Sequence, residues 1–389
     1  MSNDFTIRLS GKIDSNNAPE IEKEVDRALT DHTGETIIID ASELRYISSA
    51  GLRILMKLRK RTGKPVQVIG VSPDVYEIFE VTGFTEILDV KKRIRTVSVE
   101  GCDIVGEGFF STVYRLDDET IVKLYHSPDS DSFGMIEEGR KKSRTAFVKG
   151  IPTAIPYDIV QCGDQYGTVF ELLDAKTMNE VLLADLSRAD ERVKDYARFL
   201  KVVHGTEMDA GMLPRAVDTY MGYLESGKQY LSDPCYSKIK ELFEAMPDDN
   251  HTIHGDCHMK NIMWTAEGPM LIDLDTLSVG DPVFDFGAIY CDYRDFNKED
   301  PADSMEFFGI DDDMAQFIWD KLKEYYLDTR DEAVLTAALD KIRIVSAVRM
   351  LFLIATTDQG SEELVKRRLE RTTADLEELA SKVDGLALA

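Results

Sequence analysis

The sequence predicts two domains of different class, a small α/β domain followed by a bilobal α+β domain whose second lobe is helical. Short strands and helices alternate over the first hundred residues, strand-forming segments follow to about residue 173, and long helical segments occupy the rest. A chain of 389 residues is long enough for two such domains. We therefore expect domains at 1–97 and 98–389, the second with lobes of about 98–173 and 174–389.

The first domain alternates strand and helix patterns. Runs of β-branched or alternating apolar residues predict four strands, at 5–9, 36–40, 65–71 and 85–90. Apolar residues at helical spacing predict three helices, at 18–29, 48–58 and 74–81. Four strands and three helices in this length indicate one small α/β layer fold.

Helical patterns dominate the chain after residue 177. The expected helices are 179–204, 217–245, 312–327, 332–355 and 361–383. The last of them is charge-laced and amphipathic, so we expect it to pack on the lobe and not to form a coiled coil.

The net negative charge is confined to the second domain. Residues 1–97 contain 15 Lys+Arg and 15 Asp+Glu, which leaves 46−15=31 basic and 72−15=57 acidic residues and the whole net charge of −26 in the remainder. Such a field repels nucleic acid and anionic membranes, and it favours cationic substrates or basic partner surfaces. Acidity that serves only solubility is the alternative.

The sequence favours a cytoplasmic protein. No stretch reaches the roughly 17 apolar residues of a membrane helix, because Arg349 interrupts the longest candidate, Val345–Ala355. The N-terminus does not have the composition of a signal peptide. The five cysteines have no paired spacing with one another or with the six histidines, so we expect thiols and no zinc site.

Polar side chains suited to phosphoryl transfer gather in one region. Asp256 and Asn261 lie in the segment HGDCHMKN, which must form a tight loop. Two apolar runs around a turn then lead to Asp273 and Asp275, which project to the same face of an extended segment. One carboxylate could accept a substrate proton, while an amide and another carboxylate hold magnesium on the phosphates. The alternative is a turn-rich segment in which these residues only cap helices and turns.

A glycine-rich segment lies upstream. Gly106 and Gly108 permit close approach of the backbone to a phosphate, and the strand signal that starts at Ser111 and includes Val113 argues against a dinucleotide site, where a helix should follow. The next strand, 120–125, carries Lys123 in an apolar run, which suggests pairing with a phosphate. A surface lysine that reaches to solvent is the alternative.

From about residue 98 onward, the motifs H-G-D-x-H-x-x-N, I-D-x-D and G-D-P-V-F-D-F-G (280–287) resemble the aminoglycoside phosphotransferase and choline kinase branch of the protein-kinase-like fold. The resemblance implies that Asp256 is the catalytic base and that Asn261 and Asp273 hold Mg²⁺. Asp275 would be the further carboxylate of the metal site, behind the ligands or facing the substrate.

The same resemblance implies the contacts of ATP. Gly106, Gly108, Ser111 and Val113 would cover it, Lys123 would pair with its α- and β-phosphates, and a helix glutamate, preferably Glu138, would hold Lys123. Residues 167–174 are expected to form a buried strand that runs into a linker, whose backbone would contact adenine at Glu171 and Leu173, although both side chains could be ordinary core and surface.

Two further loop residues have expected roles. Lys260 stands where antibiotic kinases usually carry a small residue, so this cation could contact the γ-phosphate or the substrate, which makes antibiotic inactivation less certain. His254 is expected to hold the loop through local hydrogen bonds.

In the first domain, the pattern DASELRYISSAGL (40–52) resembles the STAS domain of anti-sigma-factor antagonists, and segments 11–14 and 81–84 agree with it. In that family a serine at the start of a helix accepts phosphate from a partner kinase, which implies Ser49. Ser48 replaces the usual Asp, and Ala50 replaces a second hydroxyl residue. Ser49 as a simple helix cap is the alternative.

Together these patterns predict an ATP- and magnesium-dependent phosphotransferase. The acceptor would be a hydroxyl of a small, amine-bearing molecule, and the STAS domain would regulate the enzyme, with an anti-sigma-type protein as a possible partner. One alternative is a signalling scaffold whose kinase-like part binds nucleotide with little turnover. Another is a protein kinase that acts on a STAS serine.

Overall fold

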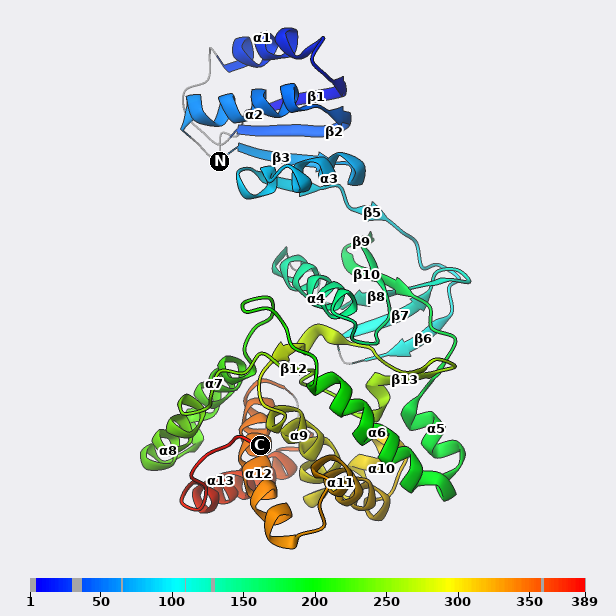
Figure 1. Ribbon diagram of the computed structural model, residues 1–389, viewed down its shortest axis with the longest axis vertical. Coiled ribbons are helices and arrows are strands. Elements are labelled where there is room, and N and C mark those ends of the chain that lie inside the picture. Colours follow the sequence, from blue (N-terminus) through cyan, green and yellow to red (C-terminus); the bar gives the residue numbers. More distant parts are fainter. Residues whose placement is uncertain are drawn as a thin grey trace. The chain divides into compact units, whose positions relative to one another are not determined.

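The computed structural model describes residues 5–29, 37–63, 66–108, 110–126, 130–357 and 360–388 (Figure 1). Thr36 and Pro65 of two expected strands, and Phe109 of the glycine-rich segment, lie outside these residues. The chain forms two compact units, Met1–Ser98 with Val160–Gly163, and Val99–Ile159 with Asp164–Ala389.

The N-terminal unit is built on a four-stranded parallel sheet whose order, β1-β2-β3-β4, follows the sequence. The strands are β1 (Phe5–Ile13), β2 (Ile37–Ile47), β3 (Val66–Val71) and β4 (Asp89–Lys92), and the helices are α1 (Ala18–Leu29), α2 (Ser49–Thr62) and α3 (Pro73–Val81). This confirms the predicted α/β fold. A two-residue strand, β5 (Arg95–Thr96), follows and pairs with Val160–Gln161 of the same unit.

The last strand of this sheet begins later than the sequence predicts. Gly83 adopts a left-handed conformation with φ 72°, and Phe84–Glu86 form a 3₁₀ turn closed by the Ile87 N–H, which donates to the Phe84 carbonyl at 3.1 Å. The Leu88 N–H donates to the same carbonyl at 2.8 Å. The predicted strand therefore starts only at Asp89, because local hydrogen bonds occupy the backbone before it.

The first lobe of the second unit is a mainly antiparallel sheet in the order β9-β10-β8-β7-β6. Its strands are β6 (Ile104–Glu107), β7 (Ser111–Arg115), β8 (Thr120–Tyr125), β9 (Pro156–Cys162, of which Pro156–Ile159 belong to this unit) and β10 (Gln165–Glu171), and its helix is α4 (Ser130–Val148). Lys123 pairs with Val113 of β7 and Thr168 of β10, so it lies on a central strand.

The second lobe is helical, as predicted. Its helices are α5 (Met178–Ala184), α6 (Ala189–His204), α7 (Ala216–Gly227), α8 (Asp233–Glu244), α9 (Val283–Tyr290), α10 (Asp303–Phe308), α11 (Asp312–Leu327), α12 (Glu332–Thr356) and α13 (Glu362–Ala380). Short strands accompany them: β11 (Lys176–Thr177), β12 (Thr252–Ile253), β13 (Ile262–Thr265), β14 (Gly268–Leu271) and β15 (Ser278–Val279). None of the helices described here is long and apolar enough to cross a membrane.

Two predicted helices are each divided. The segment 179–204 breaks where the Asp185 side chain accepts a hydrogen bond from the Ser187 N–H. The segment 217–245 breaks before α8, where Ser232 caps the new helix and a proline occupies its first turn. At both breaks a capping residue starts a new helix, and apolar periodicity alone does not reveal such residues.

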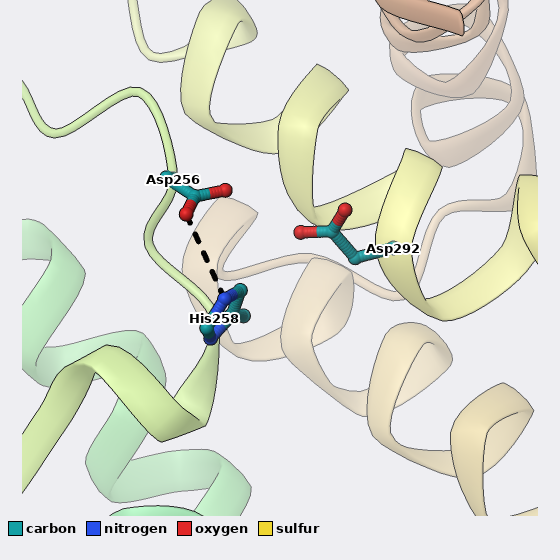
Figure 2. Close-up of side chains that lie close together, drawn as sticks. All are labelled: Asp256, His258 and Asp292. Carbon is teal, nitrogen blue, oxygen red and sulfur yellow. Dashed lines mark ion pairs between the residues drawn. The ribbon is translucent and has the colours of Figure 1, made fainter. Parts of the chain in front are cut away.

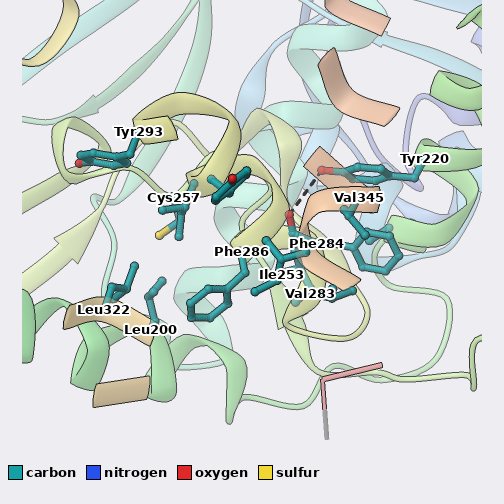
Figure 3. Close-up of a cluster of buried hydrophobic side chains, with 14 of the residues drawn as sticks. Leu200, Tyr220, Ile253, Cys257, Val283, Phe284, Phe286, Tyr293, Leu322 and Val345 are labelled. Carbon is teal, nitrogen blue, oxygen red and sulfur yellow. Dashed lines mark hydrogen bonds between the residues drawn. The ribbon is translucent and has the colours of Figure 1, made fainter. Parts of the chain in front are cut away.

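The core of the helical lobe centres on α9, all eight of whose residues are buried (Figure 3). Phe284 and Phe286 lie among aromatic and aliphatic side chains of α6, α7 and α11. Gly287 allows α9 and α12 to approach closely, since a Cβ there would lie 2.5 Å from a methyl carbon of Val345. Side chains of both helices contact the polar loop described below.

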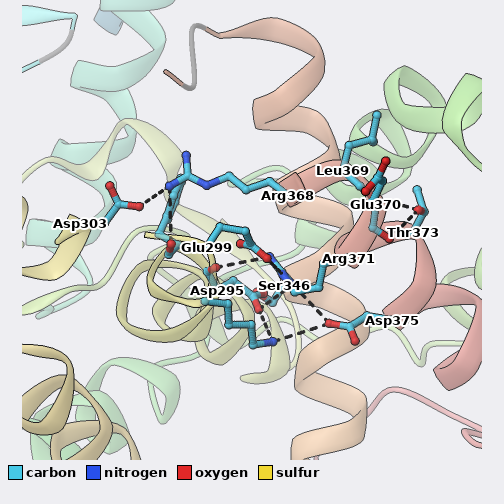
Figure 4. Close-up of polar contacts among 12 residues, drawn as sticks. Asp295, Glu299, Asp303, Ser346, Arg368, Leu369, Glu370, Arg371, Thr373 and Asp375 are labelled. Carbon is cyan, nitrogen blue, oxygen red and sulfur yellow. Dashed lines mark hydrogen bonds and ion pairs between the residues drawn. The ribbon is translucent and has the colours of Figure 1, made fainter. Parts of the chain in front are cut away.

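The last helix, α13, packs on the lobe as predicted (Figure 4). Arg368 pairs with Asp303, and Arg371 Nε lies 2.6 Å from Glu299 and its Nη1 3.2 Å from Asp295. These arginines are largely buried, so the charges of α13 serve packing inside the lobe as well as solubility.

Candidate active site

The polar loop at residues 254–261 joins β12 to β13. A 3₁₀ turn at Met259–Asn261 delivers Asn261 to the start of β13, and the β13–β14 hairpin pairs Ile262 with Leu271. The Ile272 N–H then donates to the Asn261 carbonyl at 3.0 Å. The hairpin therefore returns the chain to the loop, which places the segment of Asp273 beside it.

Asp285 of α9 holds the start of this loop. Its fully buried carboxylate accepts hydrogen bonds from the His254 N–H at 3.0 Å and the Gly255 N–H at 2.5 Å, and lies 2.9 Å from His204 Nε2. Burial alone would raise the pKa of Asp285, but His204 and the backbone N–H groups lower it below its ordinary value. The sequence showed Asp285 within a motif but gave it no role.

His254 ties the loop to the strand end before Asp273. Its Nε2 donates to the Ile272 carbonyl at 3.0 Å, and its Nδ1 accepts from the Asp256 N–H at 3.2 Å. These two contacts fix the neutral tautomer with the proton on Nε2. The expected local role of His254 is confirmed.

We expect Asp285→Ala to lower the free energy of unfolding by about 3–5 kcal/mol, because it leaves two buried N–H groups and His204 without their acceptor. The exposed Asp248→Ala should change it by less than about 0.5 kcal/mol. Since folding lowers the pKa of Asp285 from 3.8, its contribution is present above about pH 4 and is lost as the pH falls further. Urea unfolding at pH 7 and pH 3 measures both effects; an equal difference at the two pH values would contradict the assignment.

Asp256 lies in a partly buried polar cluster with His258 and Asp292 (Figure 2). Its Oδ1 accepts from Arg349 Nη2 at 2.8 Å, and its Oδ2 accepts from Asn261 Nδ2 at 3.1 Å. Ligand atoms of Asp256, His258 and Asp292 all lie within 4.8 Å of one another. Arg349 of α12 supplies positive charge to this cluster, so its carboxylates do not require a metal ion.

Burial and charge set the protonation of this cluster. Burial alone would raise the pKa of Asp256, but His258 and Arg349 lower it below its ordinary value. Burial lowers the pKa of His258 to about 4 and raises that of Asp292 to about 7. Asp256 is therefore an ionised acceptor at neutral pH, beside a neutral imidazole.

Arg349 and Asp292 were missed by sequence reasoning. The sequence contains a signal for Arg349, because a single arginine inside the apolar run Val345–Ala355 requires a buried partner. The sequence contains no such signal for Asp292, since its role depends on the packing of the helical segment Cys291–Asp295 against the loop.

Lys123 is only 9% exposed, which excludes the surface-lysine alternative. Its ammonium lies 2.6 Å from Asp273 Oδ1 and 2.8 Å from Asp275 Oδ2, and the Tyr125 hydroxyl donates to Asp275 Oδ2 at 3.0 Å. Burial would lower the pKa of Lys123, but the two carboxylates raise it above its ordinary value.

The structure corrects the expected pairing of Lys123 with Glu138. Glu138 is exposed and lies 3.9 Å from Lys142 instead. Gly139 gives the physical reason, since a Cβ at this position would lie 2.6 Å from Asp275 Oδ1. At Gly139 the helix α4 therefore presents backbone without a side chain to Asp275. Asp275 is the carboxylate that pairs with Lys123 in place of Glu138.

The glycine-rich segment forms the β6–β7 hairpin. The Gly108 N–H donates to the Ser111 carbonyl at 2.9 Å, and Gly106 lies opposite Val113, whose side chain would be 3.6 Å from an added Cβ. Ser111 is buried and pairs with Tyr125. Ser111 and Val113 therefore lie on β7, the strand next to the one that carries Lys123, whereas Gly106 lies on β6 and Gly108 follows it.

Glu171 and Leu173 differ in whether their backbone N–H groups already have a hydrogen-bond partner. The Glu171 N–H donates to the Ile155 carbonyl at 3.0 Å, and the Glu171 carboxylate accepts from the Ile155 N–H at 3.2 Å. Among the residues described, the Leu173 N–H has no hydrogen-bond partner. Leu173 is thus the better placed of the two for a ligand.

Lys260 lies away from Asp256 in this structure. Its ammonium lies over the Phe307 ring, 4.2 Å from the centroid, and donates to the Phe307 carbonyl at 3.2 Å. Partial burial lowers its pKa. The predicted contact of Lys260 with phosphate or substrate would require this side chain to turn.

The residues proposed for magnesium fit that ion. Asn261 turns its amide nitrogen to Asp256, and within the described chain its carbonyl oxygen accepts no hydrogen bond. Burial, together with the charges of Asp275 and Asp256, raises the pKa of Asp273 despite Lys123. An amide oxygen beside crowded carboxylates is a ligand set that suits Mg²⁺, whose charge would relieve their repulsion.

Ser49 lies in the other unit and is exposed in the first turn of α2. The N-cap is Ser48, whose side chain makes no capping hydrogen bond and whose hydroxyl is buried without a partner. The alternative in which Ser49 is the helix cap is therefore wrong, because α2 begins one residue earlier than that alternative requires.

The family model described as the phosphotransferase enzyme family matches residues 103–325, and that of the Mlab STAS domain matches residues 2–89. The putative anti-sigma factor antagonist BtrV of Bordetella bronchiseptica is 37% identical over 86 residues, 21% of this chain and 72% of the relative. The anti-sigma-B factor antagonist of Listeria monocytogenes is 32% identical over 89 residues, 22% of this chain and 76% of the relative.

Solved structures with a similar fold include ADP-bound aminoglycoside phosphotransferase APH(2'')-Ib, with 16% identity, a TM-score of 0.46, and coverage of 78% of this chain and 98% of that one. A choline/ethanolamine kinase family protein from Mesorhizobium loti has 14% identity, a TM-score of 0.43, and coverage of 72% and 87%. Because the family model matches more than half of the sequence, the chain belongs to the phosphotransferase enzyme family, and its N-terminal residues belong to the STAS domain family of the anti-sigma factor antagonists.

Proposed function

We propose that the protein transfers the γ-phosphate of ATP to a hydroxyl group of a small, amine-bearing molecule, with Mg²⁺ as cofactor. The observation that carries the proposal is the convergence of Asp256 and Asn261 on one loop with Asp273, which in turn contacts Lys123. A base, two magnesium ligands and a phosphate-binding lysine are the parts that kinase-type transfer requires.

The mechanism assigns one task to each part. The carboxylate of Asp256 orients the acceptor hydroxyl and accepts its proton as the hydroxyl oxygen bonds to the γ-phosphorus and the bond to ADP breaks. Lys123 pairs with the α- and β-phosphates of ATP, and Asn261 and Asp273 hold Mg²⁺, which neutralises phosphate charge. Arg349 keeps Asp256 ionised and fixes its orientation through two hydrogen bonds, one to Asp256 and one to the Gly255 carbonyl.

Binding of ATP must rearrange the pair that Lys123 makes with Asp273. Lys123 now pairs with both Asp273 and Asp275, and on binding of ATP Lys123 and Asp273 would gain new partners from the phosphates and the metal. Asp275 can keep its contacts with Tyr125 and with Lys142, which donates to the Asp275 carbonyl at 2.8 Å. We propose that Asp275 positions Lys123 and is not itself a metal ligand.

One observation favours an amine-bearing acceptor. Residues 98–389 carry the whole net charge of −26. Negative potential near the transfer site attracts cations and raises their local concentration. The signalling-scaffold alternative predicts nucleotide binding without an acceptor.

The test is release of ADP from Mg·ATP across amino-alcohols, amino-sugars, neutral sugars and purified partner proteins, with Asp256→Asn as the background control. We expect turnover above this background with at least one amine-bearing alcohol and less with the matching neutral alcohol. Turnover only with a protein acceptor would identify a protein kinase. ATP binding without turnover on any acceptor would favour the scaffold.

We also propose that phosphate on Ser49 regulates contact of the STAS domain with an anti-sigma-type partner. An exposed hydroxyl in the first turn of α2 lies where free N–H groups and the helix dipole favour an anion, and the domain is otherwise neutral. A phosphate would add about two negative charges.

Because Ser49 is not the cap, Ser49→Ala should change the free energy of unfolding by less than about 0.5 kcal/mol, and Ser49→Asp should weaken partner binding without unfolding the domain. Incubation with Mg·ATP, alone and with cell extract, followed by mass spectrometry detects the phosphate. Ser48→Ala is the neighbouring control. No phosphate at Ser49, together with wild-type binding by Ser49→Asp, would leave a docking surface without a switch.

A further inference from the structure

A cavity of about 440 Å³ lies in the helical lobe, between α6 and the end of α11, two helices that pack against each other. Its lining includes four basic side chains, Lys194, Arg198, Lys201 and Arg330, and two acidic ones, Glu324 and Asp328. None of these residues contributes to the candidate active site.

The charge of this cavity opposes that of its surroundings. Residues 98–389 contain 57 acidic and 31 basic residues, yet the cavity lining has twice as many basic as acidic side chains. Lys194, Arg198 and Lys201 are four and three residues apart, so they share one face of α6. Like charges at these spacings repel one another and destabilise a helix.

The four cations are poorly neutralised. Lys194 and Lys201 have no carboxylate within 4.0 Å in the part of the chain that the structure describes, and each lies 5.7 Å from a tyrosine ring centroid of α11. Arg198 reaches Asp195 of its own helix at 3.3 Å, and Arg330 reaches Glu324 only at 4.0 Å.

The negative end of the α11 dipole offsets part of this positive charge. The helix ends at Leu327 without a basic residue in its last turn, so cations from α6 complement its dipole. A helix terminus is equivalent to roughly half a negative charge, and Glu324 and Asp328 add two. The two carboxylates of the lining and the helix end together therefore offset less than the four positive charges of the lining.

We propose that this cavity binds a small molecule bearing a phosphate group. The excess of basic side chains in the lining favours a phosphate, which carries about −1.5 to −2 at neutral pH, and ammonium and guanidinium groups are its usual donors. The volume lies within the range of about 300–1,000 Å³ typical of small-ligand sites. A concave site of this size suits a compact ligand better than an extended polymer or a flat membrane.

The test compares wild type with Lys194→Gln/Lys201→Gln and with a matched double variant, Lys240→Gln/Lys366→Gln. The control lysines lie on α8 and α13 beside glutamates, so the change in net charge is the same. Isothermal titration calorimetry at constant ionic strength, with chelator to remove metal, would use inorganic phosphate, pyrophosphate, ADP and adenosine. Phosphate and ADP distinguish a free anion from a nucleotide as the source of the phosphate group.

We expect binding of at least one phosphate-bearing probe to weaken by tenfold or more in the cavity variant and to stay within twofold of wild type in the control. Binding at the active site would be the same in all three proteins. Equal weakening in both variants would mean a general charge effect and would overturn the proposal. Absence of binding by every phosphate-bearing probe at 10 mM, taken as about ten times a millimolar Kd, or unchanged binding in the cavity variant, would overturn it as well.

Discussion

Asp256→Asn is expected to lower the rate of phosphoryl transfer by at least ~10²-fold while nucleotide affinity stays nearly unchanged. The substitution keeps the size of the side chain and the hydrogen bond from Arg349, but it removes the group that accepts the proton of the acceptor. The buried Arg349 keeps Asp292 nearby and the Gly255 carbonyl as a partner, so the loop should remain folded. Steady-state kinetics with the best acceptor, and fluorescence titration with nucleotide, measure the two quantities.

Asp292→Asn is the matched control, because it removes a second carboxylate from the same partly buried cluster without removing the proposed base. We expect it to reduce the rate less than Asp256→Asn does, since Asp292 balances Arg349 and does not accept the proton. A larger loss in Asp292→Asn than in Asp256→Asn, with both proteins folded, would show that the base is assigned to the wrong carboxylate.

The fold was largely predictable because the apolar patterns of both domains are regular. Helices at Ala18–Leu29 and Asp312–Leu327 have the predicted bounds, since their apolar residues recur at helical spacing, and the Asp311 side chain caps the second of them. The errors fall where short-range hydrogen bonds compete with periodicity, as at Asp185 and Ser232, whose side chains begin new turns inside predicted helices.

The site was predictable only where its parts are adjacent in sequence. Asp256, Asn261 and Asp273 belong to one loop and hairpin, so spacing alone placed them together. Arg349 approaches Asp256 from 93 residues away, through the packing of α12 on α9. The predicted Lys123–Glu138 pair was wrong for a similar reason, because the rotation of α4 that directs Gly139 toward Asp275 depends on tertiary contacts.

Asp273→Asn should lower both the affinity for Mg·ATP and the rate, by at least ~10²-fold in kcat/KM, since even residues behind a metal ligand affect activity by about 10–100-fold. Asparagine is the better substitution than alanine because Asp273 has a left-handed backbone, with φ 60°, which asparagine tolerates. Asp275→Asn should cost about tenfold, because Asp275 holds Lys123 and Tyr125 and need not touch the metal.

Titration of activity with Mg²⁺ separates the two roles. Asp273→Asn should require more Mg²⁺ for half-maximal activity and regain rate as Mg²⁺ rises, whereas Asp275→Asn should keep the wild-type Mg²⁺ requirement and bind ATP more weakly. Gly139→Ala provides an independent probe, because its Cβ would displace the Asp275 carboxylate without removing any charged group. It should therefore resemble Asp275→Asn. If Gly139→Ala or Asp275→Asn shifted the Mg²⁺ requirement more than Asp273→Asn did, Asp275 would be the metal ligand and Asp273 the partner of Lys123.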